Sequence, residues 1–247
     1  MLNYVEYGKE NKYDDDIFFQ KYSQMSLSQQ GLAGAGEWQT LRKLLPDFKD
    51  KRVLDLGCGY GWHCIYAMEH GASSVVGVDI SHKMLEVAKE KTHFPQVEYK
   101  CCAIEDVEFP EESFDVILSS LAFHYVADYE ILVKKIYRIL KSGGNLVFTA
   151  YGTQDWYYNE KGEILHFPVD NYYYEGKRTA VFLGEKVTKF HRTLTTYLNT
   201  LLSNGFIINH IVEPQPPENM MDIPGMQDEM RRPMMLIVSA NKNCYTT

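Results

Sequence analysis

Three closely spaced glycines could form the backbone of a ligand-binding turn. Gly57, Gly59 and Gly61 follow a short apolar run, residues 53–56, which is typical of a buried strand, and residues 62–70 then have the apolar spacing of a helix. A strand that passes through glycines into a helix presents backbone N–H groups and the positive end of the helix dipole at one edge of a sheet. Because glycine has no Cβ, a ligand can lie directly against this backbone.

The residues around the glycines favour a cationic ligand over a phosphate. The spacing is G-x-G-x-G rather than the G-x-G-x-x-G of dinucleotide-binding turns, and no G-K-[ST] of a P-loop follows. Asp55, near the end of the strand, repels phosphate and suits an amine. S-adenosylmethionine carries an ammonium, a sulfonium and a carboxylate, and it fits such a turn. A nicotinamide-dependent oxidoreductase is the weaker alternative at this point.

A second carboxylate ends the next predicted strand. Asp79 closes residues 74–79 and lies 24 residues after Asp55, about where a ribose-binding acid stands in a β-α-β unit. Both ribose hydroxyls can donate to one carboxylate. The alternative is a helix-capping role, since Ser81 begins the following helix.

The elements that would position these residues alternate regularly along the chain. Such alternation is typical of a doubly wound, mostly parallel α/β sheet. An N-terminal helical cap would precede the sheet, with helices over residues 16–22 and 32–45 joined by the small residues 31–36. This cap could fold over a ligand as a lid, or it could pack on the side of the domain. Strands are predicted over residues 53–56, 74–79, 97–102, 113–120, 145–150, 205–212 and 234–239, and helices over 62–70, 81–91, 128–141 and 193–204.

Residues 50–150 as a set resemble the class I S-adenosylmethionine-dependent methyltransferases, in the branch that includes quinone-biosynthesis enzymes. The resemblance is carried by residues 54–61 (LDLGCGYG), by Asp79, by residues 114–117 (FDVI) and by residues 138–144 (RILKSGG). It implies a Rossmann-like sheet of seven strands with an antiparallel last strand. It also implies S-adenosylmethionine as the methyl donor. The implied cofactor-binding residues are Tyr22, Asp55, Gly57, Cys58, Gly59, Gly61, Asp79, Ile80, Ala103, Ile104, Glu105, Ser119 and Leu121.

One position departs from the family pattern. The family commonly has an aspartate, which reaches the exocyclic amine of adenine, where this chain has Ala103. Glu105 could substitute for that carboxylate, or it could be a solvated loop acid. The backbone at Ile104 could still pair with the ring.

Candidate general bases and candidate acceptor-binding residues follow the fourth and fifth predicted strands. His124 lies beyond the fourth strand and could take a proton from a nucleophile, and His191 is a second candidate base; either could instead be structural. Tyr125, Tyr173 and Arg192 are candidate substrate contacts, with Arg192 suited to an anionic group. The aromatic insert 151–192 and the methionine-rich segment 214–235 are candidate substrate covers; a hairpin with its own core and simple gap-filling are the alternatives.

Composition limits the remaining choices. The net charge of −8 argues against nucleic acid as a partner. No apolar run approaches the roughly 20 residues of a membrane helix, and no signal peptide is expected. The five cysteines lack zinc-ligand spacing, so we expect reduced thiols, no metal and a cytoplasmic protein.

The expected plan is a single methyltransferase domain. It comprises a cap (1–50), a cofactor-binding core (51–150), a cover (151–192) and a C-terminal helix with a strand pair (193–247). The acceptor is expected to be a small molecule, and the sequence does not indicate an oligomeric state. A non-catalytic, cofactor-binding regulatory protein is the alternative from another class.

Overall fold

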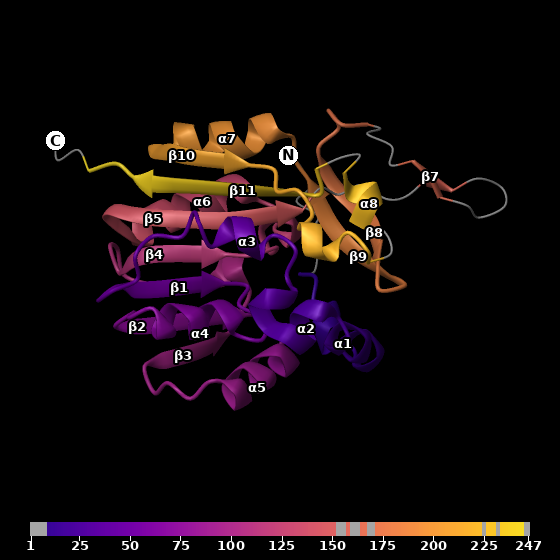
Figure 1. Ribbon diagram of the computed structural model, residues 1–247. Helices are drawn as coiled ribbons and strands as arrows, with labels where there is room; N and C mark the ends of the chain where they lie inside the picture. Colours follow the sequence, from indigo (N-terminus) through magenta and orange to yellow (C-terminus); the bar gives the residue numbers. More distant parts are fainter. Residues whose placement is uncertain are drawn as a thin grey trace.

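A seven-stranded sheet forms the centre of the molecule (Figure 1). The computed structural model describes residues 9–151, 157–158, 164–166, 171–223, 226–230 and 233–244. All neighbouring strands are parallel except β11, which pairs antiparallel with both of its neighbours. The predicted sheet and its antiparallel last strand are therefore confirmed. In order across the sheet the strands are β10 (Phe206–Val212), β11 (Met235–Lys242), β5 (Leu140–Tyr151), β4 (Phe114–Ser119), β1 (Arg52–Leu56), β2 (Ser74–Asp79) and β3 (Val97–Cys101).

Helices cover both faces of this sheet, because the side chains of its strands alternate between two apolar cores. Leu54 and Leu56 belong to the core beneath α6 (Tyr129–Ile139) and α7 (Leu194–Ser203). Val53 points to the opposite core, which holds residues of the helices α4 (Trp62–Glu69) and α5 (His82–Lys91). The chain winds from β1 through β2 to β3, then returns to the other side of β1 with β4. This reversal is the switch point at which open α/β sheets bind their ligands.

The N-terminal residues form a cap of short helices rather than the two helices predicted. Their elements are η1 (Lys12–Asp14), α1 (Asp16–Ser23), α2 (Ser26–Gln30), η2 (Gly31–Gly34) and α3 (Trp38–Leu41). The predicted helix over residues 32–45 was wrong for most of its length. Gly34 explains part of the break, since a Cβ there would lie 2.3 Å from the carbonyl oxygen of Ser26. The close approach of these two backbone segments requires a turn and not a continuous helix.

The boundary between α6 and β5 also differs from the prediction. The helix is predicted to reach Lys141, but it ends at Ile139 and β5 begins at Leu140. The β4–β5 pairing shifts register between Phe114, opposite Leu140, and Val116, opposite Asn145. Gly143 and Gly144 lie in this irregular stretch. A Cβ on Gly144 would be 2.9 Å from the carbonyl oxygen of Asp115, so the glycines serve strand pairing and not helix termination.

The segments that follow β5 gather at the carboxyl ends of the parallel strands (Figure 1). They include a short pair of strands, β6 (Tyr157–Tyr158) and β7 (Ile164–His166), and a hairpin of β8 (Gly176–Phe182) and β9 (Glu185–His191). Between β10 and β11 lie η5 (Glu218–Met220) and α8 (Met226–Glu229). Trp156 and Phe167, two of the aromatic residues of the insert, lie outside the described residues.

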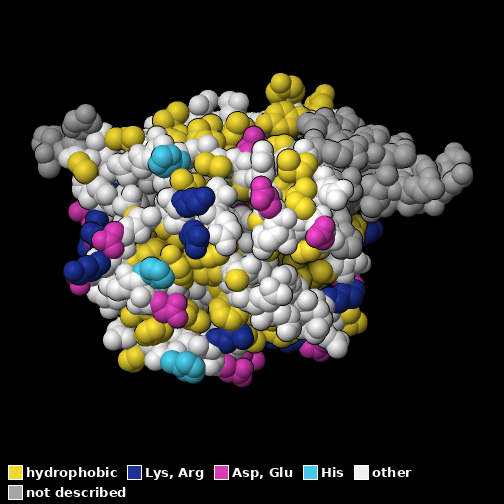
Figure 2. All heavy atoms as spheres, in the orientation of Figure 1, with side chains coloured by type: hydrophobic (Ala, Val, Ile, Leu, Met, Phe, Trp, Pro, Cys, Tyr) yellow, Lys and Arg dark blue, Asp and Glu magenta, His cyan; other side chains and the backbone are white. Residues whose placement is uncertain are grey.

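The surface carries charges of both signs. Figure 2 shows Lys and Arg interspersed with Asp and Glu among the coloured residues of the face it presents, with hydrophobic side chains between them. Within the described part of the chain, no helix is both long enough and apolar enough to span a membrane. The same residues bring no three His, Cys, Asp or Glu side chains together as a metal site would require.

Candidate active site

A cavity of about 620 Å³ lies at the carboxyl ends of the central strands. Its floor comprises the turns that follow β1, β2, β3 and β4, and three segments, called covers here, line it from above. The N-terminal cover is residues 9–37, the hairpin cover is residues 176–191 and the methionine cover is residues 214–223, 226–230 and 233–235; each contributes lining side chains. The volume is within the range of roughly 300–1,000 Å³ that is typical of cofactor and substrate sites.

The glycine turn forms the part of the floor between β1 and α4. All three glycines have positive φ, at +79°, +51° and +76°, but for different reasons. A Cβ on Gly57 would lie 2.5 Å from the Cβ of Ala122, and one on Gly61 would lie 2.2 Å from the hydroxyl of Tyr99. A Cβ on Gly59 would meet nothing within 4 Å, although this residue lines the cavity. The backbone at Gly59 therefore faces the space that a ligand can use.

Asp79 adjoins this turn. Its carboxylate accepts hydrogen bonds from the backbone N–H groups of Gly59 at 2.8 Å and Ser81 at 2.9 Å. Burial raises the pKa of this carboxyl, although the two backbone hydrogen bonds oppose the shift. The carboxylate thus links the ends of β1 and β2 at the cavity wall.

A second aspartate, Asp14, attaches the N-terminal cover to the turn that follows β2. Asp14 accepts hydrogen bonds from the Ser81 hydroxyl at 2.6 Å and from the Lys83 backbone N–H at 3.2 Å, at the start of α5. The hydroxyls of Tyr13 and Tyr125 are 3.2 Å apart, and this contact joins the cover to the loop after β4. The cap therefore closes over the sheet, as the lid interpretation of the sequence predicted.

The loop after β4 contains a residue in a strained conformation. Leu121 has a φ of +54°, which is rare for a side chain other than glycine, and its N–H donates to the Thr149 hydroxyl at 2.9 Å. Such strain tends to be retained where it positions a functional backbone. The turn η4 (Phe123–Tyr125) follows and brings His124 and Tyr125 to the cavity.

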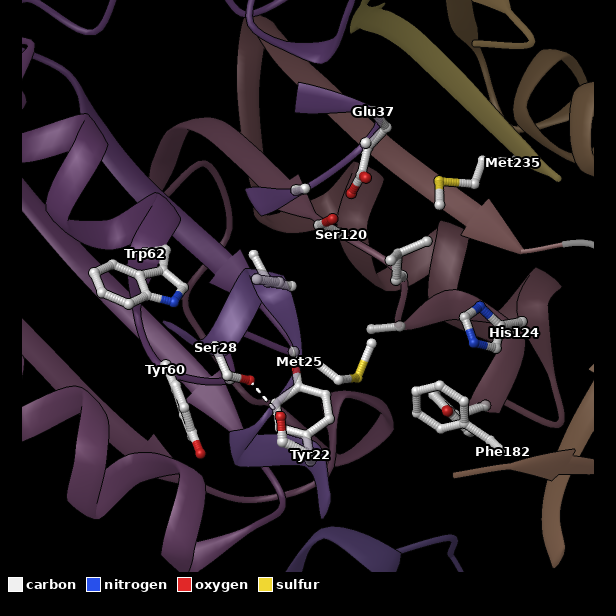
Figure 3. A pocket seen from close by; sticks show the side chains of 18 of the residues that line it. Tyr22, Met25, Ser28, Glu37, Tyr60, Trp62, Ser120, His124, Phe182 and Met235 are labelled. Carbon is white, nitrogen blue, oxygen red and sulfur yellow. Dashed lines mark hydrogen bonds between the residues drawn. The ribbon is translucent and has the colours of Figure 1, made fainter. Parts of the chain in front are cut away.

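His124 is buried, with 2% of its surface exposed. Burial lowers the pKa of its imidazole well below the usual range, and the positive charges of Lys189 and Arg192 add to the shift. The ring is consequently neutral near pH 7, and the same shift makes it a weaker base than an ordinary histidine. It lines the cavity together with Phe182 of the hairpin cover (Figure 3).

Most of the predicted cofactor residues come together in this cavity. Those that line it are Tyr22, Gly57, Cys58, Gly59, Asp79, Ile80, Ala103, Ile104, Glu105 and Leu121, together with the predicted base His124 and the predicted substrate residue Tyr125. Burial raises the pKa of the Glu105 carboxyl, so this side chain is not a fully solvated loop acid. The role of each residue stays a prediction.

Three predicted cofactor residues do not reach the cavity. Asp55 is fully buried behind the glycine turn, where one oxygen accepts from the Cys64 thiol at 3.5 Å and the other has no hydrogen-bond partner among the described residues. Ser119 is also buried and donates its hydroxyl to the carbonyl oxygen of Leu56 at 2.8 Å. Gly61 lies at the start of α4, where its Cα faces Tyr99. Direct contact of these residues with a ligand is not supported by their positions.

Three other predicted residues lie elsewhere for identifiable reasons. Tyr173 is 88% exposed. His191 is buried, with its Nε2 2.8 Å from the carbonyl oxygen of Tyr172. Arg192 donates to the carbonyl oxygens of Phe123, Val126 and Ala127, and so holds the η4 turn. The geometry does not support a catalytic or substrate-binding role for these three; Arg192 instead positions the turn that contains His124.

Glu37 is a cavity residue that the sequence reasoning missed. It precedes α3, only 5% of its surface is exposed, and its carboxylate is directed toward Ser120 (Figure 3). Trp62 and His63, on the first turn of α4, also line the cavity. Glu37 stands beside the buried Trp38 at the start of the short helix α3. Such a pair has no periodic signature, so no pattern in the sequence could identify Glu37 as a cavity residue.

Comparison with known proteins assigns a class to this arrangement. Residues 54–148 match the model of a methyltransferase domain. The chain is 54% identical to a Listeria monocytogenes protein assigned to the S-adenosylmethionine-dependent methyltransferases, over 86% of this chain and 99% of that one, with a TM-score of 0.81. It is 39% identical to an S-adenosylmethionine-dependent methyltransferase of Mesorhizobium loti, over 86% of this chain and 100% of that one, with a TM-score of 0.78.

Relatives known from sequence differ in how much of them the chain covers. An uncharacterised Haemophilus influenzae protein is 33% identical over 95% of this chain and 98% of its own length. Other relatives match less than half of this chain, and the chain spans between 26% and 55% of their length. They include ubiquinone biosynthesis O-methyltransferases.

Proposed function

The chain belongs to the S-adenosylmethionine-dependent methyltransferases, and we propose that the acceptor of its methyl group is a small molecule held beneath the three covers. The family membership establishes the enzyme class and the donor. It also displaces the two alternatives, a nicotinamide-dependent oxidoreductase and a non-catalytic binding protein. The observation that supports a small acceptor is that residues of the N-terminal, hairpin and methionine covers all line the cavity.

The residues present fit the donor. The open side of Gly59 leaves room for a ligand against the backbone, and the Asp79 carboxylate adjoins it. We assign the ribose hydroxyls to Asp79 and the adenine ring to the Ala103–Glu105 loop, where the small side chain of Ala103 leaves the recognition to Ile104 and Glu105. The buried indole nitrogen of Trp62 has no hydrogen-bond partner within the described structure, as expected where a ligand supplies one.

The chemistry requires little of the protein beyond alignment and the exclusion of water. S-adenosylmethionine supplies, when bound, a methyl group that its sulfonium already activates. The covers exclude water, and the strained Leu121 turn orients the floor beside the acceptor. His124, neutral and buried, would take the proton of an oxygen or nitrogen acceptor at a ring nitrogen, and Tyr125 would contact the acceptor.

The remaining expectations for the chain are also part of the proposal. We infer one domain from residue 1 to 247 and a cytoplasmic location, which the five free cysteines of the described chain support. A nucleic-acid acceptor is disfavoured by the net charge of −8. The interspersed charges of the face in Figure 2 agree with this preference.

A transfer experiment tests the proposal. The protein is incubated with donor labelled in its methyl group and with either the ultrafiltrate or the retentate of a cell extract. We expect label to enter compounds of the ultrafiltrate. Label confined to protein or nucleic acid in the retentate would overturn the small-molecule assignment, and an absence of heat on titration with S-adenosylhomocysteine would overturn the donor site.

A further inference from the structure

Glu37 is a buried carboxylate without a cationic partner. It lines the cavity with its carboxylate directed toward Ser120 (Figure 3), and no ion pair involves it among the described residues. Burial raises the pKa of this carboxyl. Burial therefore favours the neutral form of this carboxyl, and a cation bound beside it would stabilise the charged form.

Two nearby buried nitrogen atoms also lack partners. Neither Nε1 of Trp62 nor Nε2 of His63 has a hydrogen-bond partner within the described structure. Buried polar atoms without partners are rare in native proteins, and each one requires an explanation. Both residues stand on the first turn of α4, which has no side-chain cap. This end of the helix carries positive partial charge and therefore favours an anion.

Glu37, Trp62, His63 and Ser120 all line the same cavity. Ser120, toward which the Glu37 carboxylate is directed, and His63 also line a second, small void. The ring of His63 packs at 5.8 Å from that of Trp38, the neighbour of Glu37 in the chain. Figure 3 shows the Glu37 carboxylate directed toward Ser120, and the indole nitrogen of Trp62 on the side of the ring that faces the other labelled side chains. Burial lowers the pKa of His63 to about 4, so this ring adds no positive charge at neutral pH.

The pattern of charge matches an α-amino acid. One negative group stands on one side, while an N–H donor and an uncapped helix start stand on the other. The methionine end of the donor has the complementary groups, an ammonium and a carboxylate. Asp55, which the sequence favoured for the ammonium, is separated from the cavity by the glycine turn.

We propose that Glu37 binds the ammonium of the donor's methionine end and that the indole N–H of Trp62, with the start of α4, binds its carboxylate. This assignment rests on the proposed function, because it requires the donor to lie in this cavity. It makes the N-terminal cover a part of the cofactor site and not only a lid. The adenosine part of the donor is held separately, by Asp79 and the Ala103–Glu105 loop.

Two ligands distinguish binding of the donor's methionine end from binding of its adenosine. S-adenosylhomocysteine has the amino-acid group, and 5′-methylthioadenosine has the same nucleoside without it. Both are titrated calorimetrically into the wild-type protein, Glu37→Gln and Trp62→Phe. We expect Glu37→Gln to lower the affinity for S-adenosylhomocysteine about 10- to 100-fold. Trp62→Phe should lower the same affinity about 2- to 10-fold. Binding of 5′-methylthioadenosine should be unchanged in both variants.

A comparison variant and three outcomes make the test decisive. Glu105→Gln, at the adenosine end, should change the affinities of the two ligands by the same factor. Equal binding of S-adenosylhomocysteine by Glu37→Gln and the wild type would overturn the assignment, and so would an equal loss for both ligands. Trp62→Phe changes no charge and provides an independent arm if Glu37→Gln folds poorly. A wild-type protein that binds neither ligand would instead refute the proposed function itself.

Discussion

The Asp79 carboxylate accepts the backbone N–H of Gly59 across a distance of 2.8 Å, which ties the second strand of the sheet to the glycine turn of the first. The same carboxylate accepts from Ser81 N–H through its other oxygen. A group that holds two N–H donors in place is pre-organised to accept further hydrogen bonds from ribose hydroxyls.

The first prediction follows from this arrangement. Asp79→Asn should weaken S-adenosylhomocysteine and 5′-methylthioadenosine alike, by about 10- to 100-fold, because charge-assisted hydrogen bonds to the ribose are lost. Calorimetric titration measures the change. Glu86→Gln, on the exposed surface of α5, should leave both affinities as they are. Unaltered affinity in Asp79→Asn would remove Asp79 from the cofactor site.

A pair of glycine substitutions should separate ligand binding from stability. Gly59→Ala places its methyl group in open space beside the cavity, so it should reduce cofactor affinity at a backbone cost of about 1 kcal/mol. Gly61→Ala places the methyl group 2.2 Å from the Tyr99 hydroxyl and should chiefly lower the free energy of unfolding. Denaturant unfolding and cofactor titration on both variants measure the two effects. The reverse pattern would mean that the ligand does not lie against Gly59.

The buried Asp55 should make stability depend on pH. Burial raises its pKa from 3.8 to about 7, so the folded protein retains a proton that the unfolded chain releases near pH 4. Folding stability should then fall as pH rises through this window, by up to about 1.4 kcal/mol per pH unit, and level off above pH 7. Asp55→Asn should flatten that part of the profile in denaturant unfolding measured from pH 4 to 8. An identical slope in the variant would show that Asp55 keeps its ordinary pKa.

The contact between the N-terminal cover and the floor should control how fast the cofactor leaves. Tyr13→Phe removes the hydroxyl that lies 3.2 Å from Tyr125, and dissociation of S-adenosylhomocysteine should become about 2- to 10-fold faster. Stopped-flow displacement measures this rate. Tyr174→Phe, on a ring that is 78% exposed, is the matched control and should dissociate at the wild-type rate. If both variants match the wild type, the cover does not gate release.

The sheet and its ligand-binding edge could be predicted because local patterns determine them. The apolar runs before Asp55 and Asp79 read as buried strands, and the helix α5 begins with Ser81 as its cap, one residue from the predicted start. Glu37 could not be predicted, since its burial depends on a fold of the cap that brings it to Ser120, more than eighty residues away. Arg192 was misassigned for a related reason: a cation in an aromatic segment suggests an anion site, whereas the carbonyl groups of the η4 turn satisfy it.

The N-terminal cover and the hairpin cover share a small apolar cluster, with Phe18 from one packed against Ala180 and Val187 from the other. Lifting either segment alone would expose that cluster to water. The two should therefore swing as one gate, through which donor and acceptor both pass. Release of the demethylated donor and release of the methylated product would then occur in the same step. The rate at which the two covers open would set the turnover rate.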